Sequence, residues 1–323
     1  MKILVTGCAG FIGYHLTLRL LSSTNHKIFG IDNLNNYYDI KLKKQRLKIL
    51  KKDSKFKFYK IDLINKRKLK SNFTINKYNI IIHLAAQAGV RFSIKNPQNY
   101  FDNNISAFFN IIDLSKLIKV KHFIFASTSS VYGDTKTFPV KEEASTDKPL
   151  SFYAATKKCN EIIAYSYSNI FKLKCTGLRF FTVYGPFGRP DMALFKFTKS
   201  ILENKYLELF NFGKHIRDFT YIDDVVNYII KLMHIYPKKE VPFQIFNIGS
   251  NNPQKLKTFL KFIEKSVYKK AKISYKKLQS GDIYKTHSDN SSIIKKTKIY
   301  PKMELKLGIE KFVKWYKNFY NRK

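Results

Sequence analysis

Short apolar runs alternate with helical patterns along the first half of the chain. The runs are rich in β-branched and aromatic residues, and they predict strands at 2–6, 28–32, 56–61, 80–84, 122–127 and 174–180. Apolar residues at helical spacing predict helices near 11–22, 39–52, 99–118 and 152–170. Strands that are apolar throughout and alternate with helices indicate a parallel sheet covered on both faces. The pattern therefore predicts an α/β protein with a doubly wound parallel sheet of the Rossmann type.

The regular alternation fades after about residue 180. Pro186, Gly188 and Pro190 interrupt the chain, and shorter elements follow as far as a final helix near 304–321. We therefore expect a Rossmann domain over 1–180 that holds the cofactor and the catalytic residues. A smaller C-terminal α/β domain over 181–323 is expected to bind most of the substrate above the strand ends, with some segments returning to the Rossmann core.

Three glycines directly follow the first predicted strand. Gly7, Gly10 and Gly13 are spaced GxxGxxG, a variant of the dinucleotide fingerprint, and a helix opens among them. Glycines let the backbone approach a pyrophosphate, which the helix N-terminus attracts. Asp32 ends the second strand, where a carboxylate accepts hydrogen bonds from the adenosine ribose and repels a 2′-phosphate. The sequence therefore predicts NAD as the cofactor rather than NADP.

A tyrosine and a lysine one helical turn apart form the candidate catalytic pair. Tyr153 and Lys157 are expected on the same face of a helix. A free tyrosine has a pKa near 10, so a tyrosine base needs nearby positive charge, which a lysine ammonium and the nicotinamide ring both supply. The hydroxyls of Thr128, Ser129 and Ser130 follow a strand at the same expected edge of the sheet. This set is suited to moving protons to and from a substrate oxygen.

In this order along the chain, the motifs resemble the extended short-chain dehydrogenase/reductase family over nearly the full length. The resemblance implies that Thr128 and Tyr153 are the acid/base hydroxyls and that Lys157 is the tuning cation. The cofactor contacts that it implies are Gly7, Gly10, Phe11, Ile12, Gly13, Asp32, Asn33, Asp62, Leu63, Leu84, Ala85, Ala86, Gln87, Asn103, Tyr153, Lys157 and Phe181.

Within that family, the segments 32–38, 88–91, 179–186, 188–195 and 217–224 are similar to UDP-glucuronate 4-epimerases. The resemblance implies NAD-dependent 4-epimerisation of a UDP-uronic acid through a 4-keto intermediate. The substrate contacts that it implies are Arg91, Thr128, Ser129, Ser130, Thr182, Arg189, Ala193, Phe210, Arg217 and Asp282. Gln279 and Ser280 stand where the family usually has proline before Gly281 and Asp282.

Neighbouring activities differ from this one in the residues after Thr128. Sugar dehydratases of the family carry Asp-Glu there, and UDP-glucuronate decarboxylases carry a nearby Glu, whereas this chain has Ser129 and Ser130. Thr182 replaces an asparagine that is typical of UDP-galactose 4-epimerases. The alternatives left open are an N-acetylated UDP-hexosaminuronate, a neutral UDP-hexose, decarboxylation of UDP-glucuronate, or a catalytically silent relative that binds nucleic acid.

The net charge of +37 is the unusual feature of the composition. Sixty Lys and Arg face 23 Asp and Glu, but the basic residues are spread over the whole chain. Lysine, asparagine, isoleucine, tyrosine and phenylalanine all have A/T-rich codons, so we interpret the excess as solvated surface rather than a nucleic-acid site. Capture of anionic substrates and binding to nucleic acid or to a membrane surface are the alternatives.

The remaining expectations concern compartment and assembly. No apolar run is long enough to span a membrane. The three cysteines, Cys8, Cys159 and Cys175, are too unevenly spaced for a disulfide framework or a metal site, which favours the cytoplasm. Family relatives dimerise through the helices corresponding to 99–118 and 152–170, so the resemblance also implies a homodimer.

Overall fold

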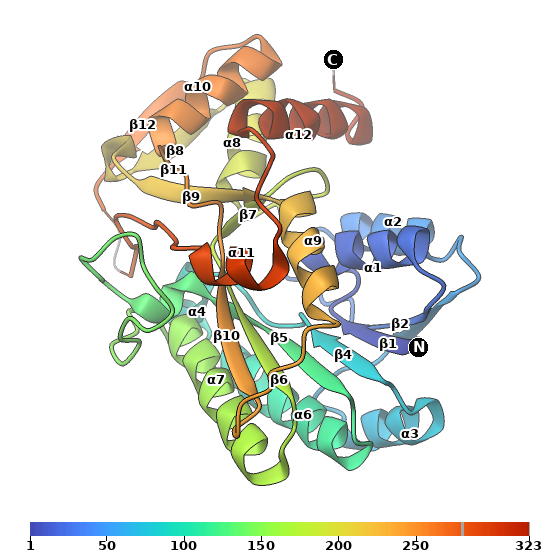
Figure 1. Cartoon of the computed structure of the whole chain (residues 1–323). Coiled ribbons are helices and arrows are strands. Elements are labelled where there is room, and N and C mark those ends of the chain that lie inside the picture. Colours follow the sequence, from blue (N-terminus) through green and yellow to red (C-terminus); the bar gives the residue numbers. More distant parts are fainter. Residues whose placement is uncertain (279–280, 323) are drawn as a thin grey trace.

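The computed structural model describes residues 1–278 and 281–322, and its centre is a seven-stranded parallel sheet (Figure 1). The strand order is β10-β6-β5-β4-β1-β2-β3, and all neighbouring strands run parallel. The strands are β1 (Lys2–Thr6), β2 (Lys27–Asp32), β3 (Phe56–Lys60), β4 (Ile80–His83), β5 (His122–Thr128), β6 (Cys175–Phe180) and β10 (Phe243–Ile248). The predicted Rossmann-type fold is confirmed, and the six predicted strands are present to within a residue at each end.

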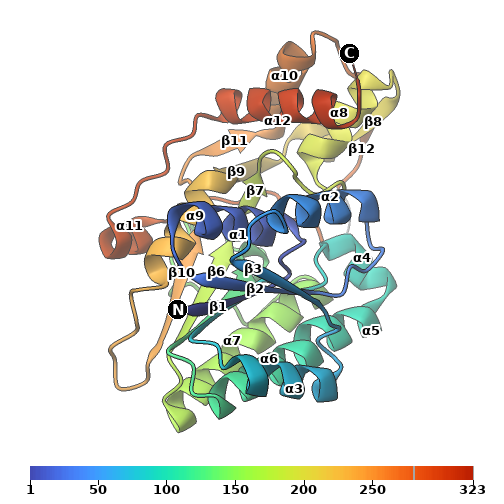
Figure 2. The ribbon, with the colours of Figure 1, turned by 90° about the vertical axis from the view of Figure 1, so that its right-hand side faces the viewer.

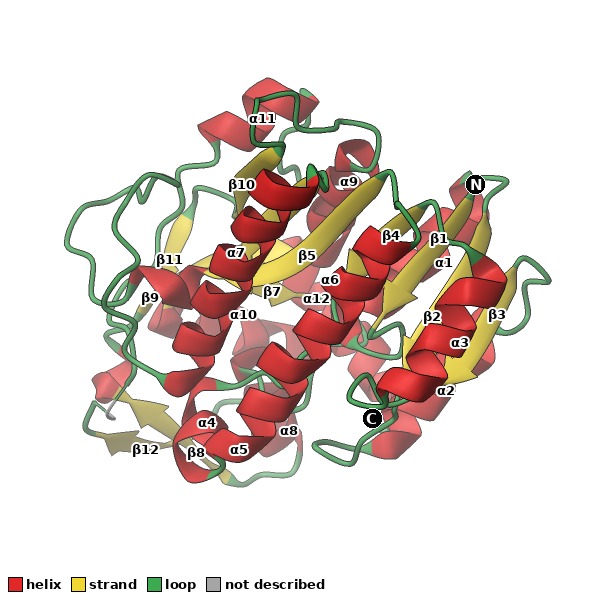
Figure 3. Ribbon diagram, turned by 90° about the horizontal axis from the view of Figure 1, so that it is seen from below, coloured by secondary structure: helices red, strands yellow, loops and turns green. Residues whose placement is uncertain are grey.

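Helices cover both faces of this sheet. Figure 3 shows α3, α6 and α7 side by side on one face, whereas α1, α2 and α9 lie on the other face (Figure 1). Their bounds are α1 (Phe11–Ser23), α2 (Ile40–Leu50), α3 (Lys66–Asn76), α6 (Ala107–Leu117), α7 (Phe152–Phe171) and α9 (Ile222–Leu232). The helix α3 was not predicted, because only two apolar side chains of its polar sequence, Leu69 and Phe73, are buried.

The segment predicted as one helix near 99–118 is built from three pieces. A short helix, α5 (Pro97–Tyr100), leads into a π-helical turn, η1 (Phe101–Ser106), and α6 follows without a break in the chain. π-helical turns insert an extra residue into a helix and are frequent at functional sites. Here the turn lies beside the loop that follows β4, because Asn104 within it bonds to Gln87.

Most of the C-terminal part of the chain lies beyond the end of β6, above the main sheet in the view of Figure 2. It contains two small sheets, one ordered β11-β9-β7 and one in which β12 pairs with β8. The strands are β7 (Thr182–Tyr184), β8 (Tyr206–Phe210), β9 (Ile216–Tyr221), β11 (Pro253–Lys255) and β12 (Lys272–Lys276). The helical elements outside the two layers on the main sheet are α4 (Val90–Lys95), α8 (Ala193–Leu202), α10 (Leu256–Val267), α11 (Ser291–Thr297), α12 (Leu305–Phe319), η2 (Ser129–Tyr132) and η3 (Asn211–Gly213).

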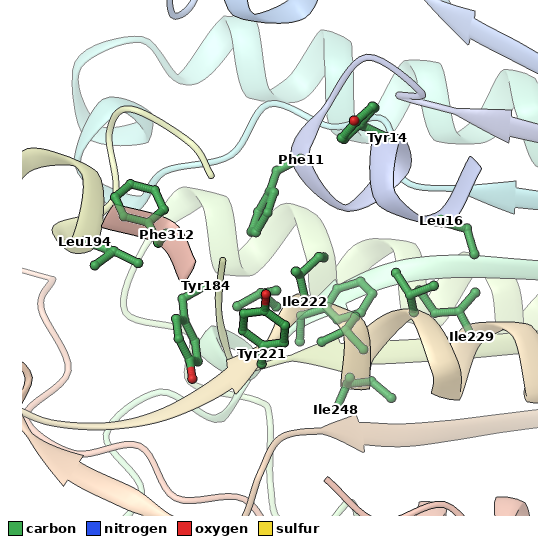
Figure 4. Packing of buried hydrophobic residues seen from close by; sticks show 14 of the residues in the cluster. Phe11, Tyr14, Leu16, Tyr184, Leu194, Tyr221, Ile222, Ile229, Ile248 and Phe312 are labelled. Atoms are coloured by element: carbon green, nitrogen blue, oxygen red, sulfur yellow. The ribbon is translucent and has the colours of Figure 1, made fainter. Parts of the chain in front are cut away.

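One continuous apolar core joins the sheet to this C-terminal part. Phe11 of α1, Tyr184 of β7, Ile222 of α9 and Phe312 of α12 belong to the same buried cluster (Figure 4). Ile248, at the end of β10, is also in the cluster, so a strand from beyond residue 181 completes the main sheet. The strand order changes direction at β1, between β4 and β2, and ligands of doubly wound sheets bind in the crevice outside the carboxyl ends at that point.

Candidate active site

The turn between β1 and α1 requires glycine at two positions, Gly7 and Gly13. Gly7 has a φ of +71°, and a Cβ there would lie 2.8 Å from the backbone nitrogen of Ala85. A Cβ at Gly13 would lie 2.1 Å from the carbonyl oxygen of Gly7. No side chain among the described residues caps the helix that starts at Phe11, so its first N–H groups are available to an anion. This is the geometry that a pyrophosphate requires.

Asp32 is held against this turn at the end of β2. Its Oδ2 accepts a hydrogen bond from the backbone N–H of Ala9 (3.1 Å), and its Oδ1 accepts one from Leu34 (2.8 Å). Burial raises the pKa of Asp32, while these hydrogen bonds and the charge of Lys43 act in the opposite direction. Next to it, the Asn33 amide donates to Oδ2 of Asp62 (3.0 Å). The predicted adenosine-binding residues 32, 33 and 62 therefore form one linked group.

The loop after β4 forms the next part of the crevice. Leu84 and Ala85 are tied to β1, since their N–H groups donate to the carbonyl and hydroxyl oxygens of Thr6 (3.2 and 3.3 Å). Gln87 is fixed by Asn104, whose Oδ1 accepts from its N–H (2.8 Å) and whose Nδ2 donates to its carbonyl (3.0 Å). The predicted Asn103 instead donates to the carbonyl of Asn99 (2.9 Å). Asn104 was missed because its role depends on the π-helical turn.

Tyr153 and Thr128 meet where α7 begins and β5 ends. Ser151 caps α7 by accepting a hydrogen bond from the N–H of Ala154 (3.2 Å), which places Tyr153 in the first turn. Tyr153 is partly buried, and burial raises the pKa of its phenol; the charge of Arg189 and a hydrogen bond with the Thr128 side chain lower it. The predicted acid/base pair is thus within hydrogen-bonding reach.

Lys157 lies one helical turn further along the same face of α7. It is 1% exposed, and its Nζ has no hydrogen-bond partner in the described part of the chain. Burial lowers its pKa from the ordinary 10.5 to about 8, and the charge of Glu161 opposes that effect. A buried ammonium without a partner is suited to hold an oxygen of a bound ligand, as the ribose hydroxyls of NAD would provide.

Uncharged hydroxyls follow the end of β5, where Thr128 lies near Tyr153. Thr128 Oγ1 accepts from the N–H of Ser130 (3.2 Å) and donates to its Oγ (3.3 Å), so the two side chains lie together at the start of η2. Thr182 begins β7 and lines a small cavity with Arg189, Ala193 and Phe11. The cavity therefore brings the cofactor turn and the predicted sugar-binding residues together.

Arg189 is engaged within the protein. Its guanidinium donates to both carboxylate oxygens of Asp191 (3.0 and 2.5 Å), and the hydroxyl of Tyr37 donates to the same carboxylate (3.4 Å). Both members of the ion pair are partly buried. Asp191 was absent from the predicted site, because an acid two residues after the arginine gives no sequence signal of its own. Any anion that binds Arg189 must share it with this carboxylate.

A second group of predicted residues gathers near the end of β8. Arg91 stacks on the ring of Phe210, 4.3 Å from its centroid, and donates to Oδ2 of Asp282 (2.9 Å). Arg217 donates to the carbonyl of Ile283 (2.6 Å), and burial lowers its pKa to about 10. This pairing of an aromatic ring with two guanidinium groups fits a pyrimidine nucleotide diphosphate. Residues 279 and 280 lie outside the described residues.

His215 is a further side chain in this group that sequence reasoning missed. It is buried, its Nε2 has no hydrogen-bond partner among the described residues, and its pKa is lowered to about 4 by burial and by the charge of Arg217. Over the same residues, no three His, Cys, Asp or Glu side chains are placed to share a metal ion. No helix in that part of the chain combines the length and apolarity needed to cross a bilayer.

Comparison with known proteins agrees with this geometry. The sequence model of the NAD dependent epimerase/dehydratase family matches residues 3–249. The chain is 39% identical over 337 residues to a probable UDP-glucuronate 4-epimerase of Rhizobium meliloti (strain 1021), covering 100% of this chain and 98% of that protein. It is 41% identical over 315 residues to a UDP-glucuronate 4-epimerase of Thermodesulfobacterium geofontis (strain OPF15), covering 97% and 95%.

A solved structure matches over the same length. UDP-glucuronic acid 4-epimerase from Bacillus cereus, in complex with UDP-glucuronic acid and NAD, is similar with a TM-score of 0.93 and 35% identity. The match covers 99% of this chain and 100% of that one. The glycine turn, the acid that ends β2 and the Tyr153/Lys157 pair lie on the shared fold. The chain therefore belongs to the NAD dependent epimerase/dehydratase family.

Proposed function

We propose that this protein is a UDP-glucuronate 4-epimerase, which interconverts UDP-glucuronate and UDP-galacturonate. The observation that carries the proposal is the uncharged set that follows β5 near Tyr153. Thr128 and Ser130 share a hydrogen bond, Ser129 lies between them in the chain, and Thr182 comes two residues after Phe180, which pairs with Thr128. Acid/base chemistry at a sugar hydroxyl needs Tyr153, whereas elimination of water needs carboxylates at positions that serines occupy here. Full-length similarity to proteins named for this activity supports the same assignment.

The residues at the carboxyl ends of β1, β2, β4 and β5 fit NAD. Gly7, Gly10 and Gly13 leave the backbone open to a pyrophosphate, Asp32 faces the same turn, and Lys157 carries an unpartnered ammonium. When bound, NAD would supply an acceptor for the hydride of C4 and then return it. In this arrangement residues 1–180 hold the cofactor and the catalytic groups, and residues 181–323 provide most of the sugar-nucleotide site.

Tyr153 is assigned the proton transfer at the C4 hydroxyl. Burial raises the pKa of its phenol, so the phenolate depends on the charge of Arg189 and on the side chain of Thr128, which both lower that pKa. Lys157, one turn further along α7, is assigned as a further cation for the phenolate. Removing the C4 hydroxyl proton allows the C4 hydrogen to leave as hydride, which yields a 4-keto sugar. After that sugar has turned about its phosphate linkage, the hydride would return to the opposite face of C4, and Tyr153 would return its proton to the C4 oxygen.

The 4-keto sugar has a ketone β to its C5 carboxylate, and such acids readily lose CO2. The site must therefore hold the carboxylate near the ring plane, where the bond to CO2 overlaps poorly with the carbonyl. Hydroxyls can donate hydrogen bonds to the sugar carboxylate, and they are too weakly acidic to supply the proton that elimination of water would need. Ser129, Ser130 and Thr182 are assigned this role, together with Arg189, whose fork is shared with Asp191.

At the other end of the substrate, Arg217 and Arg91 are assigned to the diphosphate and the stacked Phe210 to the uracil. Opposite charge favours guanidinium contacts with phosphate oxygens, and Asp282 keeps Arg91 in place until then. The high net charge of +37 would raise the rate of encounter with such an anionic substrate.

A homodimer through α6 and α7 is part of the proposal. These helices lie side by side on one face of the sheet (Figure 3). They expose large apolar side chains to solvent in the single chain, among them Phe109 at 42%, Ile162 at 58% and Tyr165 at 51%. An apolar surface of this kind is typical of a subunit interface. The three free thiols and the nucleotide-sugar substrate favour the cytoplasm as its location.

The test is turnover of UDP-glucuronate by the purified protein with added NAD+. Products are separated by anion exchange and identified by NMR, with Tyr153→Phe as the control. UDP-galacturonate formed without net NADH, and lost in the control, is the expected result. Release of a UDP-pentose as the main product would assign decarboxylation instead. No turnover of UDP-glucuronate alongside turnover of an N-acetylated or neutral UDP-sugar would refute the proposed substrate.

A further inference from the structure

A buried ion pair lies directly behind the catalytic residues. Glu161 and Arg179 have side chains that are 3% and 5% exposed, and the guanidinium donates to both carboxylate oxygens (2.9 and 2.8 Å). Ser127 donates a third hydrogen bond, from its Oγ to Oε1 of Glu161 (2.6 Å). Neither the proton transfer nor substrate binding uses these three groups. Removing two charges from water costs free energy, so we expect this buried pair to have a function.

The position of Glu161 links it to each catalytic element. It follows Lys157 by one helical turn and Tyr153 by two, so all three lie along one face of α7. Its partner Ser127 immediately precedes Thr128 at the end of β5. The carboxylate therefore ties the helix that carries Tyr153 and Lys157 to the strand that carries Thr128.

Arg179 extends the tie to the serines of η2. Its Nη1 donates to the hydroxyl of Tyr132 (2.9 Å), the last residue of η2, and to the carbonyl of Glu142 (2.8 Å). The hydroxyl of Tyr132 in turn donates to Oδ1 of Asn247 in β10 (2.6 Å). The network thus holds both ends of the segment from Thr128 to Tyr132, which contains the two serines beside the sugar position.

Charge gives the pair a second effect. Among the described residues, Glu161 is the anion that acts on the buried ammonium of Lys157 and opposes the fall in its pKa. His83 faces Lys157 from β4, but burial and that ammonium lower its pKa to about 3, so it is neutral in the working range. Arg179 faces Glu161 from β6, and Arg189 and Asp191 face Tyr153 from the loop after β7.

We infer that Glu161 is a positioning residue of this active site. Its carboxylate, held by Arg179 and Ser127, keeps Lys157 charged beneath Tyr153 and fixes Thr128 against the start of α7. A glutamine at position 161 keeps the shape and one acceptor but removes the negative charge. Lys157 then loses its proton at lower pH. Over a range of pH in which the wild-type protein still offers NAD a charged lysine, the variant offers a neutral amine.

The test measures NAD+ affinity by isothermal titration calorimetry as a function of pH. The affinity of the wild-type protein for NAD+ is expected to fall as the pH rises through the pKa of Lys157, which is about 8. This fall gives a break in the plot of affinity against pH, and Lys157→Met is expected to remove it. Glu161→Gln should move the break to lower pH by about one pH unit. Glu142→Gln is the matched control, because it neutralises a partly buried carboxylate of the same network that bonds to the N–H of Asn247. Its break should stay in place.

A purely structural role predicts a different outcome. It would weaken binding or stability in Glu161→Gln without moving the break, and that result overturns the inference, as does a wild-type profile with no break. If Glu161→Gln does not fold, Glu161→Gln with Arg179→Met removes both charges. Its break should still lie at lower pH than in the wild-type protein, by a smaller shift, because Arg179 no longer adds a positive charge. The inference rests on the proposed function only for its effect on turnover. Failure to convert UDP-glucuronate would refute that function, while the NAD+ profile still decides the role of Glu161.

Discussion

Replacing Lys157 with methionine should stabilise the fold, and under the proposed function it should also abolish turnover. Lys157 is almost completely buried, and its ammonium has no hydrogen-bond partner among the described residues. A methionine fills the space of the lysine stem and has no charge to desolvate. The variant therefore removes an unfavourable interaction from the folded protein and leaves the unfolded chain almost unchanged.

The size of the effect follows from the pKa of Lys157. Burial lowers it from 10.5 to about 8, and at about 1.4 kcal/mol per pH unit this corresponds to about 3 kcal/mol. Between those two values the unfolded chain binds more protons than the folded one, so the free energy of unfolding of the wild-type protein rises with pH there. Below the folded pKa, the full cost of the buried ammonium is present.

The assay is urea denaturation followed by circular dichroism at a series of pH values. Lys157→Met should unfold at higher urea than the wild-type protein near neutral pH, and the difference should shrink as the pH approaches 10.5. Lys199→Met, at an exposed position of α8, is the control and should show no such trend. A Lys157→Met protein that is no more stable than wild type, with a gap independent of pH, would refute the reasoning.

Four further predictions concern single sites. Thr182→Ala should increase the UDP-pentose by-product at least severalfold, because a hydroxyl beside the carboxylate is lost; unchanged product purity by NMR contradicts this role. Asp218→Asn should lower the free energy of unfolding by about 3 kcal/mol in urea denaturation, since its buried carboxylate accepts five hydrogen bonds and an amide cannot. Gly13→Ala should abolish NAD+ binding in calorimetry, because its Cβ would lie 2.1 Å from a carbonyl oxygen, whereas Gly10→Ala, with 2.9 Å, should weaken binding less. Ile162→Asp should yield monomers in analytical ultracentrifugation if α7 forms the dimer interface, and an unchanged dimer would move the interface elsewhere.

The features of the fold that the sequence predicts are the local ones. Five of the six predicted strands of the main sheet are mostly buried apolar runs, as parallel strands covered on both faces are. The edge strand β3 buries only Phe56 and was predicted from its aromatic residues. The strand β10 was not predicted, since polar residues interrupt its sequence and it returns to the sheet from far along the chain. The helix α3 was missed for a similar reason, because it buries only a narrow apolar stripe.

In the candidate site too, the residues that were predicted are those with a local sequence signal. The glycine turn, Asp32 and the Tyr153/Lys157 pair carry their own spacing signals, because each acts through residues that are neighbours on one turn or one helix face. Asn104 and Asp191 have no such signal, since their roles depend on partners brought close by the fold. The pairing of Arg189 with Asp191 in particular depends on side-chain geometry that spacing does not specify.

The buried ion pair and the unpartnered lysine serve the same requirement, which is that Lys157 is both charged and free to bind its ligand. A hydrogen bond from Lys157 to a protein acceptor would make the folded protein more stable. The ammonium would then be held away from the cofactor and the phenol of Tyr153. Leaving Lys157 unpartnered keeps it available and lets burial lower its pKa to about 8. A carboxylate placed one turn away, rather than in contact, opposes this loss of charge without occupying the ammonium. Arg179 and Ser127 keep that carboxylate in place, so the charge acts on Lys157 from a fixed position while the amine stays free for its ligand.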